Sequence, residues 1–156
     1  METAVFRSPI GDLQLCVENF FLTEVRLLRE DEKISPADGG EKSDTMQEVF
    51  HQLEEYFSGK RKEFTIPLKV SGTEFQQRVW KALQDIPYGE TRSYEEIAIA
   101  AGSPKALRAV GQANHQNNIL ILIPCHRVIR KDGTVGGFGA GVENKKYLLR
   151  LEADFS

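Results

Sequence analysis

Hydrophobic and polar residues alternate with a period of two near the start of the chain. In "SPIGDLQLCVENFFLTEVRLL" (8–28) the alternating apolar positions are Leu13, Leu15 and Val17, then Phe21, Val25 and Leu27. Such alternation is typical of strands that bury one face. It predicts two antiparallel strands joined through Glu18-Asn19. A second alternating stretch, "EFTIPL" (63–68), predicts a further strand.

Between these stretches the pattern takes the period of an α-helix. Apolar residues fall on one helical face and Gly59 follows the last of them. The face consists of Met46, Val49, Phe50, Leu53 and Phe57. The segment "SPADGGEKS" (35–43) before it is expected to be a loop. Residues 1–70 are therefore predicted to form a small N-terminal domain, an antiparallel sheet with one helix.

Short helices are expected from Thr73 onward, because capping residues precede each apolar stripe. Thr73 is the predicted N-cap of a helix that carries Val79, Trp80 and Leu83 on one side. Ser93 and Glu96 have the spacing of a capping box. The helix that they begin is expected to end at Gly102.

Another helix is predicted to start at once after Gly102, with Ser103 as its cap and Pro104 at its first position. It would hold Lys105 and Arg108 on a surface, with Leu107 and Val110 facing inward. Two short helices joined by a glycine-containing turn indicate a helix-turn-helix. This element is a candidate for docking on DNA.

A run of five aliphatic residues, 119–123, ends at Pro124 and is followed by Cys125, His126 and Arg127. The run predicts a buried strand that ends at the edge of the core. Nearby positive charge is expected to lower the pKa of the Cys125 thiol. His126 is a candidate base, but neighbouring strand residues point to opposite faces. Contact between them therefore needs a turn or a bridging water, and spacing does not choose the carboxylate that would orient the imidazole.

Composition describes an ordinary soluble domain of 156 residues, 40% hydrophobic and 28% charged. Two cysteines, Cys16 and Cys125, are too few to predict a disulfide framework. Cys16 lies in a predicted strand and is expected to be inert, and His51 is expected to be solvated or half-buried. No ligand spacing for zinc is seen, and no signal peptide or membrane-spanning run. We expect a cytoplasmic protein without metal or membrane attachment.

Charge is distributed unevenly along the chain. Residues 1–63 hold 8 Lys+Arg and 14 Asp+Glu, a net of −6, and residues 64–156 hold 12 and 9, a net of +3. Residues 97–131 contain no acid, and carry Lys105, Arg108, Arg127, Arg130 and Lys131. A surface that faces phosphate needs such a stretch. When it is considered alone, this acid-free stretch is explained equally well by chance.

The motifs together resemble one family. "IPCHRVI" (123–129) and "GTVGGFGAGVENKKYLLRLE" (133–152) resemble the methylated-DNA–protein-cysteine methyltransferases, the O6-alkylguanine-DNA alkyltransferases. The likeness extends through "GTEFQQRVWKALQDIPYGETRSYEEIA" (72–98) and "KALRAVGQANHQNN" (105–118), and more loosely to "SPIGDLQL" and "LEEYFSGKRKEFTIPL". It implies direct reversal of DNA damage, in which an alkyl group moves irreversibly, once per molecule, from O6-alkylguanine to Cys125. O4-alkylthymine would react more slowly.

The resemblance also assigns roles to residues. Cys125 would be the acceptor, His126 its water-mediated base, Glu152 the carboxylate that orients His126, and Asn117 a buttress of the active-site loop. Tyr94 would help to rotate the nucleotide and protonate the leaving base, and Arg108 would fill the gap in the base stack. The expected DNA-binding residues are Arg108, Tyr94, Lys105, Ser103, Ala109 and Arg127, and the expected pocket wall is Val135, Gly136, Phe138, Gly139 and Ala140.

Two other functions stay open from the residues alone. The first is a non-catalytic helix-turn-helix regulator, and the second a cysteine hydrolase acting on a small amide or ester. The expected fold is α/β (α+β): the domain of residues 1–70, followed by a helical module of residues 71–156 with the helix-turn-helix and the active-site cysteine. The expected partner is double-stranded DNA carrying O6-alkylguanine or O4-alkylthymine. The protein is expected to be a monomer without DNA and to need no cofactor.

Overall fold

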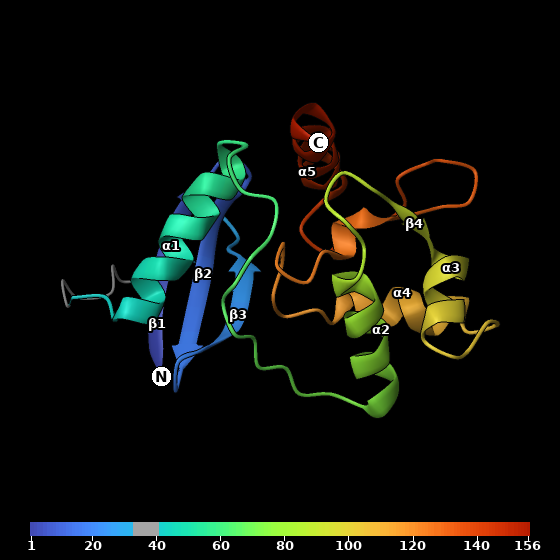
Figure 1. The fold of residues 1–156 in the computed structure, drawn as a ribbon, viewed down its shortest axis with the longest axis horizontal. Helices are drawn as coiled ribbons and strands as arrows, with labels where there is room; N and C mark the ends of the chain where they lie inside the picture. The colour runs from blue at the N-terminus through green and yellow to red at the C-terminus, as the bar shows by residue number, and fades with distance from the viewer. Residues whose placement is uncertain (33–40) are drawn as a thin grey trace. The chain divides into compact units, whose positions relative to one another are not determined.

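The computed structural model describes residues 1–32 and 41–156, and their contacts divide into two units, Met1–Lys69 and Val70–Ser156. The first unit contains a three-stranded antiparallel sheet of β1 (Glu2–Ser8), β2 (Gly11–Glu18) and β3 (Phe21–Leu27), in the order β1-β2-β3 (Figure 1). With the helices described below, the sheet confirms the predicted α/β class. Strand β1 was not predicted, and residues 35–40 of the predicted loop lie outside the described residues.

The hairpin between β2 and β3 follows the predicted alternation except at the start of β3, where Phe21 is exposed and Leu22 is buried next to a register shift at Cys16/Val17. Leu13, Leu15 and Val25 are fully buried on its inner face. The two turn residues, Asn19 and Phe20, have φ angles of 50° and 70°, as the tight turns that match the twist of a hairpin require. The turn thus lies one residue later than predicted.

Helix α1 (Asp44–Phe57) packs against β1 in the first unit (Figure 1). The Ser43 side chain accepts a hydrogen bond from Met46 N and caps the helix. Phe6 of β1 contacts the rings of Phe50 and Phe57, with centroids 5.3 Å and 6.2 Å apart. These aromatic contacts join the helix to the sheet, and the predicted helix is confirmed.

The predicted strand at 63–68 is wrong. Its only pairing among the described residues is a single bridge between Leu68 and Leu22. The Gln52 side chain of α1 takes the place of a neighbouring strand, because it accepts a hydrogen bond from Thr65 N at 3.0 Å and donates to Thr65 Oγ1 at 2.7 Å. Pro67 also lacks the N–H that a ladder needs.

The second unit is mainly helical. Its helices are α2 (Glu74–Gln84), α3 (Tyr94–Ala100), α4 (Leu107–His115) and α5 (Val142–Phe155), and α2, α3 and α4 pack against one another. Strands β4 (Arg92–Ser93) and β5 (Val128–Ile129) form a short parallel pair. The capping boxes of Thr73 and Ser93 are both present. None of the helices in the described part of the chain has the length and apolar character needed to cross a membrane.

The helix pair α3–α4 is present, but α4 begins later than predicted. Gly102 N donates to Ile99 O and Ser103 N donates to Ala98 O, which together close the C-terminus of α3 in a Schellman motif. Ser103 therefore ends one helix instead of capping the next, and Lys105 precedes α4. Leu107 is 45% exposed and does not face inward, whereas Val110 is buried as predicted.

The aliphatic run 119–123 is a buried loop and not the predicted strand. Ile121 has a φ of 73°, which reverses the chain. The Asn117 side chain joins the two ends of the loop, because Oδ1 accepts from Ile119 N at 2.9 Å and Nδ2 donates to Ile123 O at 2.7 Å. Leu120 is half-buried and the other four apolar side chains are buried, and further local hydrogen bonds run from Leu122 N to Leu120 O and from Ile123 N to Ile119 O.

Candidate active site

A hollow of about 330 Å³ in the second unit contains the Cys125 thiol. Four segments form its walls: α3, α4, the segment that carries Cys125, and the loop that precedes α5. The predicted residues Tyr94, Arg108, Phe138 and Gly139 line it. The complete lining is Tyr94, Arg108, Gly111, Gln112, Asn114, His115, Cys125, Gly137, Phe138 and Gly139.

Cys125 is the first residue of a single 3-10 turn, η1 (Cys125–Arg127), which follows Pro124. Only 5% of the residue is exposed. Asn117 Nδ2 donates a hydrogen bond to Cys125 Sγ at 3.3 Å. The same amide fixes the loop that leads to η1, so Asn117 couples the thiol to the end of α4.

Burial raises the pKa of the Cys125 thiol, while the Asn117 hydrogen bond and the positive charge of Lys145 act in the opposite direction. The expected lowering of this pKa is therefore wrong for the protein without substrate. Desolvation penalises a thiolate more than the neighbouring donors favour it. Removal of the thiol proton consequently needs a base close to Cys125.

His126 is fully buried and has the tautomer that a base requires. Its Nε2 lies 2.7 Å from Glu152 Oε2. A carboxylate accepts, so Nε2 carries the proton and Nδ1 keeps its lone pair. Nδ1 is buried and has no hydrogen-bond partner among the described residues. Burial lowers the pKa of His126, although Glu152 acts in the opposite direction. The lowered pKa favours the neutral imidazole.

Glu152 is held between His126 and Arg127. Arg127 Nε and Nη2 donate to its two carboxylate oxygens at 2.7 Å and 3.0 Å, and Nη1 donates to Ile86 O at 2.8 Å. Burial opposes ionisation of Glu152, but His126 and Arg127 outweigh it and lower the pKa to about 2. Arg127 is only 6% exposed, so its predicted place on a DNA-facing surface is wrong. It holds the carboxylate instead.

Lys145 is a buried part of the site that the sequence analysis missed. Its ammonium donates to Val128 O at 2.6 Å and to Gly137 O at 3.1 Å. Burial lowers the pKa of Lys145 to about 8. One signal was available: Lys145, Leu148 and Glu152 are spaced i, i+3 and i+7, which puts Lys145 on the buried face of α5.

The loop before α5 forms only part of the predicted pocket wall. Phe138 and Gly139 line the hollow together with Gly137, which also belongs to the loop that the resemblance assigned to the pocket wall, whereas Val135, Gly136 and Ala140 do not line it. Gly136 has another use: a Cβ there would lie 3.0 Å from Tyr94 Oη, and its φ is 73°. The residue keeps the loop close to the tyrosine because glycine alone tolerates both conditions.

The predicted DNA-binding residues lie at or near the start of α4. Arg108 is exposed on its first turn and lines the hollow, as does the half-buried Tyr94 of α3. Ser103 and Lys105 lie in the turn between the two helices, and Ala109 follows Arg108 with partial exposure. The structure therefore brings two of the candidate DNA contacts, Tyr94 and Arg108, to the hollow that Cys125 lines.

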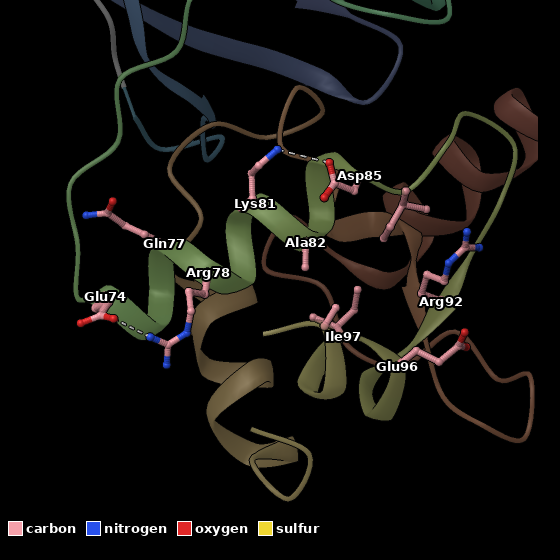
Figure 2. Close-up of a pocket in the computed structure, with 11 residues that line it drawn as sticks. Glu74, Gln77, Arg78, Lys81, Ala82, Asp85, Arg92, Glu96 and Ile97 are labelled. Carbon is pink, nitrogen blue, oxygen red and sulfur yellow. Dashed lines mark hydrogen bonds and ion pairs between the residues drawn. The ribbon is translucent and has the colours of Figure 1, made fainter. Parts of the chain in front are cut away.

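A second hollow of the same unit, about 720 Å³, lies between α2 and α3 (Figure 2). Four of its six charged residues pair with one another, Glu74 with Arg78 at 2.9 Å and Lys81 with Asp85 at 3.5 Å. No cysteine or histidine lines it. Although it is larger, it lacks the nucleophile and base of the Cys125 hollow.

Two further candidate groups, Cys16 and His51, lie in the surroundings that were predicted for them. Burial and the hydrogen bond from Sγ to Glu24 raise the pKa of Cys16 to about 12, which favours the protonated thiol. His51 is exposed and lies 3.3 Å from Glu55. No cluster of three or more His, Cys, Asp or Glu suited to a metal ion occurs within residues 1–32 and 41–156.

Comparison with known proteins gives a consistent assignment. The family model "6-O-methylguanine DNA methyltransferase, DNA binding domain" matches residues 74–154, and the model for its "ribonuclease-like domain" matches residues 1–70. The chain is similar to the methylated-DNA–protein-cysteine methyltransferase of Methanosarcina barkeri, with 48% identity covering 95% of this chain and 94% of the relative. The constitutive enzyme of that name from Bacillus subtilis is 46% identical, covering 93% and 91%. A crystal structure of Mycobacterium tuberculosis OGT in complex with DNA is 44% identical, with a TM-score of 0.89 over 100% of this chain and 95% of that chain.

Proposed function

This chain belongs to the 6-O-methylguanine DNA methyltransferase family, and we propose that it repairs DNA by moving an alkyl group from guanine O6 to Cys125. The observation that best supports this proposal is that Cys125 lines a hollow that Tyr94 and Arg108 also line. The names of its relatives favour a transferase over a non-catalytic regulator. The inferred partner is duplex DNA carrying O6-alkylguanine or, with slower reaction, O4-alkylthymine.

The reaction begins with activation of the thiol. A water molecule next to Nδ1 of His126 takes the Cys125 proton and passes it to the imidazole, whose opposite nitrogen is fixed by Glu152 at 2.7 Å. Support for this relay comes from the buried lone pair of Nδ1, which has no partner in the described residues. The carboxylate then stabilises the imidazolium that forms.

The thiolate attacks the alkyl carbon, so that an S–C bond forms and the C–O6 bond breaks with its electron pair moving to O6. The leaving guanine takes up a proton, for which Tyr94 is the proposed donor, and Tyr94 regains a proton from solvent while the His126 imidazolium releases one to it. Burial raises the pKa of Tyr94, which keeps its hydroxyl protonated. The net change is thiol plus O6-alkylguanine to thioether plus guanine. No cofactor enters this balance.

Guanine O6 lies on the base-pairing edge, so the nucleotide must leave the stack before the thiol can reach it. Arg108, exposed on the first turn of α4, is the proposed side chain that occupies the gap. Contacts to phosphate from the acid-free stretch, including Lys105, provide affinity with little sequence preference. We further propose that the protein acts in the cytoplasm and is monomeric without DNA.

Incubation with duplex DNA containing O6-methylguanine tests this function. The intact mass of the protein should increase by one methyl group in place of one hydrogen, with the adduct on the peptide containing Cys125. Cys125→Ser should give no adduct and retain duplex affinity, while Cys16→Ser should react like the unaltered protein. Transfer by Cys125→Ser at the normal rate would exclude Cys125 as the acceptor.

A further inference from the structure

We propose that Lys145 is a positioning residue for alkyl transfer, whose ammonium joins the segment carrying the acceptor thiol to the wall of the pocket. The inference rests on the proposed function and adds a residue to it. Lys145 is 1% exposed and comes from α5, which separates it in sequence from both segments that it joins.

The two hydrogen bonds of Lys145 end on two different segments of the chain. Val128 O, at 2.6 Å, belongs to the residue directly after η1, and Val128 pairs with Arg92 of β4. Gly137 O, at 3.1 Å, belongs to the loop that lines the hollow. One ammonium group therefore fixes the distance between the thiol and the loop against which the base would lie.

Burial of an ammonium group to join two loops is unfavourable by itself. Its desolvation raises the free energy of the folded state, and two hydrogen bonds to carbonyls offset only part of this. An apolar side chain of similar volume is often tolerated better in such positions. The charged and titratable groups that act on Lys145 are Cys125 and Arg130, and Lys145 in turn acts on His126. Because Cys125 favours the charged lysine, the ammonium favours the thiolate by the same interaction.

This arrangement predicts a particular pH dependence. Burial lowers the pKa of Lys145 to about 8, so alkali removes a proton that the two hydrogen bonds and the thiolate both use. The rate of alkyl transfer should therefore decline above about pH 8, although more thiol ionises there. Lys145 and Cys125 titrate as a coupled pair, so the decline is a property of both.

The test uses the full chain with Lys145→Met, which keeps the volume without charge or donors, and Lys145→Gln, which keeps a donor without charge. Lys146→Met is the matched control, because Lys146 is an exposed neighbour paired with Glu143 at 3.6 Å. Transfer from duplex O6-methylguanine is measured in single turnover from pH 6 to 10. The pH dependence of Cys125 alkylation by iodoacetamide gives the thiol pKa, and circular dichroism checks folding.

Lys145→Met should transfer on the order of 10- to 100-fold more slowly at pH 7.5, as expected for a misplaced reacting group. Its rate should rise with pH without the alkaline decline, and its thiol pKa should be higher. The transfer rate and thiol pKa of Lys145→Gln should lie between those of Lys145→Met and of the unaltered protein. Lys146→Met should match the unaltered protein in both. The inference would be overturned if the transfer rate of the unaltered protein did not decline at alkaline pH. It would also be overturned if the Lys145 variants had the same transfer rate and the same Cys125 pKa as the unaltered protein. Absence of any Cys125 adduct in the unaltered protein would instead reject the proposed function.

Discussion

Arg127 and Glu152 form a buried ion pair through two parallel hydrogen bonds, from Nε to Oε1 at 2.7 Å and from Nη2 to Oε2 at 3.0 Å. The same guanidinium donates to Ile86 O at 2.8 Å. Oε2 also contacts His126 Nε2 at 2.7 Å. The orientation of the proposed base therefore depends on an arginine that directly follows it in sequence, acting through a carboxylate 25 residues farther along.

Arg127→Met should destabilise the protein by about 3–5 kcal/mol, because it leaves Glu152 buried with one partner fewer. Arg127→Lys should lose less stability, because its ammonium keeps the positive charge beside Glu152. It should still lose some, because an ammonium cannot form the two parallel hydrogen bonds of the guanidinium. Urea unfolding measures both. Lys81→Ala is the control, a lysine whose exposed pair with Asp85 should contribute about 0–1 kcal/mol. Equal losses in Arg127→Met and Lys81→Ala would contradict the assigned role of the buried pair.

Acid should destabilise the fold through the same cluster. The pKa of Glu152 is lowered from 4.5 to about 2, so its stabilising contribution is present above pH 4.5 and is lost as the pH falls toward 2. The pKa of His126 is lowered from 6.5, so the unfolded chain binds its proton first and stability declines below pH 6.5. Both effects have the same sign. The Glu152 part is on the order of 3 kcal/mol.

Urea unfolding at pH 7.5, 6, 5 and 4 measures this dependence. The free energy of unfolding should fall below pH 6.5 and more steeply below pH 4.5 in the unaltered protein. Glu152→Gln should start lower at pH 7.5 and lack the steeper part. The difference between the two curves isolates the carboxylate, and a constant difference across this range would contradict the prediction.

Local sequence signals predicted the elements whose ends are fixed locally. Thr73 and Ser93 cap α2 and α3 through side chains three residues apart from their partners. The alternation of Leu13 and Leu15 predicted the inner face of β2 in the same way, because the two-residue period of a strand can be seen from neighbouring positions in the chain. Cys125 and His126 were found because the apolar run and proline before them are also local features.

Signals that depend on side-chain contacts of the folded chain were misread. The run 119–123 has the composition of a strand, but the chain reverses at Ile121 and the Asn117 side chain bonds to Ile119 N and Ile123 O. Arg127 was assigned to a surface because its partners, Glu152 and Ile86, lie far from it in sequence. Lys145 was missed for the same reason, since Val128 and Gly137 become its acceptors only in the folded chain.

Arg108→Ala should separate extrusion from chemistry. If Arg108 occupies the gap in the base stack, its loss should slow repair of duplex O6-methylguanine by about tenfold or more, the scale of a few kcal/mol for unstacking. Reaction with free O6-benzylguanine, which needs no extrusion, should change little. Single-turnover rates on both substrates measure this, with Arg78→Ala as control. Equal slowing on both would mean that Arg108 supports the pocket, which it lines, and not the DNA stack.

The last prediction concerns regeneration of the thiol. An ordinary cysteine hydrolase forms a thioester, whose carbonyl lets water attack and release the enzyme. Here a saturated carbon moves to Cys125, and the product is a thioether. It has no carbonyl for water to add to, and a thiolate is a poor leaving group from an unactivated carbon. The role proposed for His126 is to accept a proton in the forward step, and this provides no route back.

Excess methylated duplex should therefore give one exponential phase with an amplitude of about one alkyl group per protein molecule, followed by no further turnover. Counting transferred groups against protein that is titrated for active sites measures the amplitude, and peptide mass spectrometry locates the adduct. Cys16 is the internal control, because the raised pKa of about 12 keeps that thiol protonated and unreactive under the same conditions. A sustained linear phase well beyond one equivalent, or an adduct on Cys16, would be incompatible with irreversible transfer to Cys125.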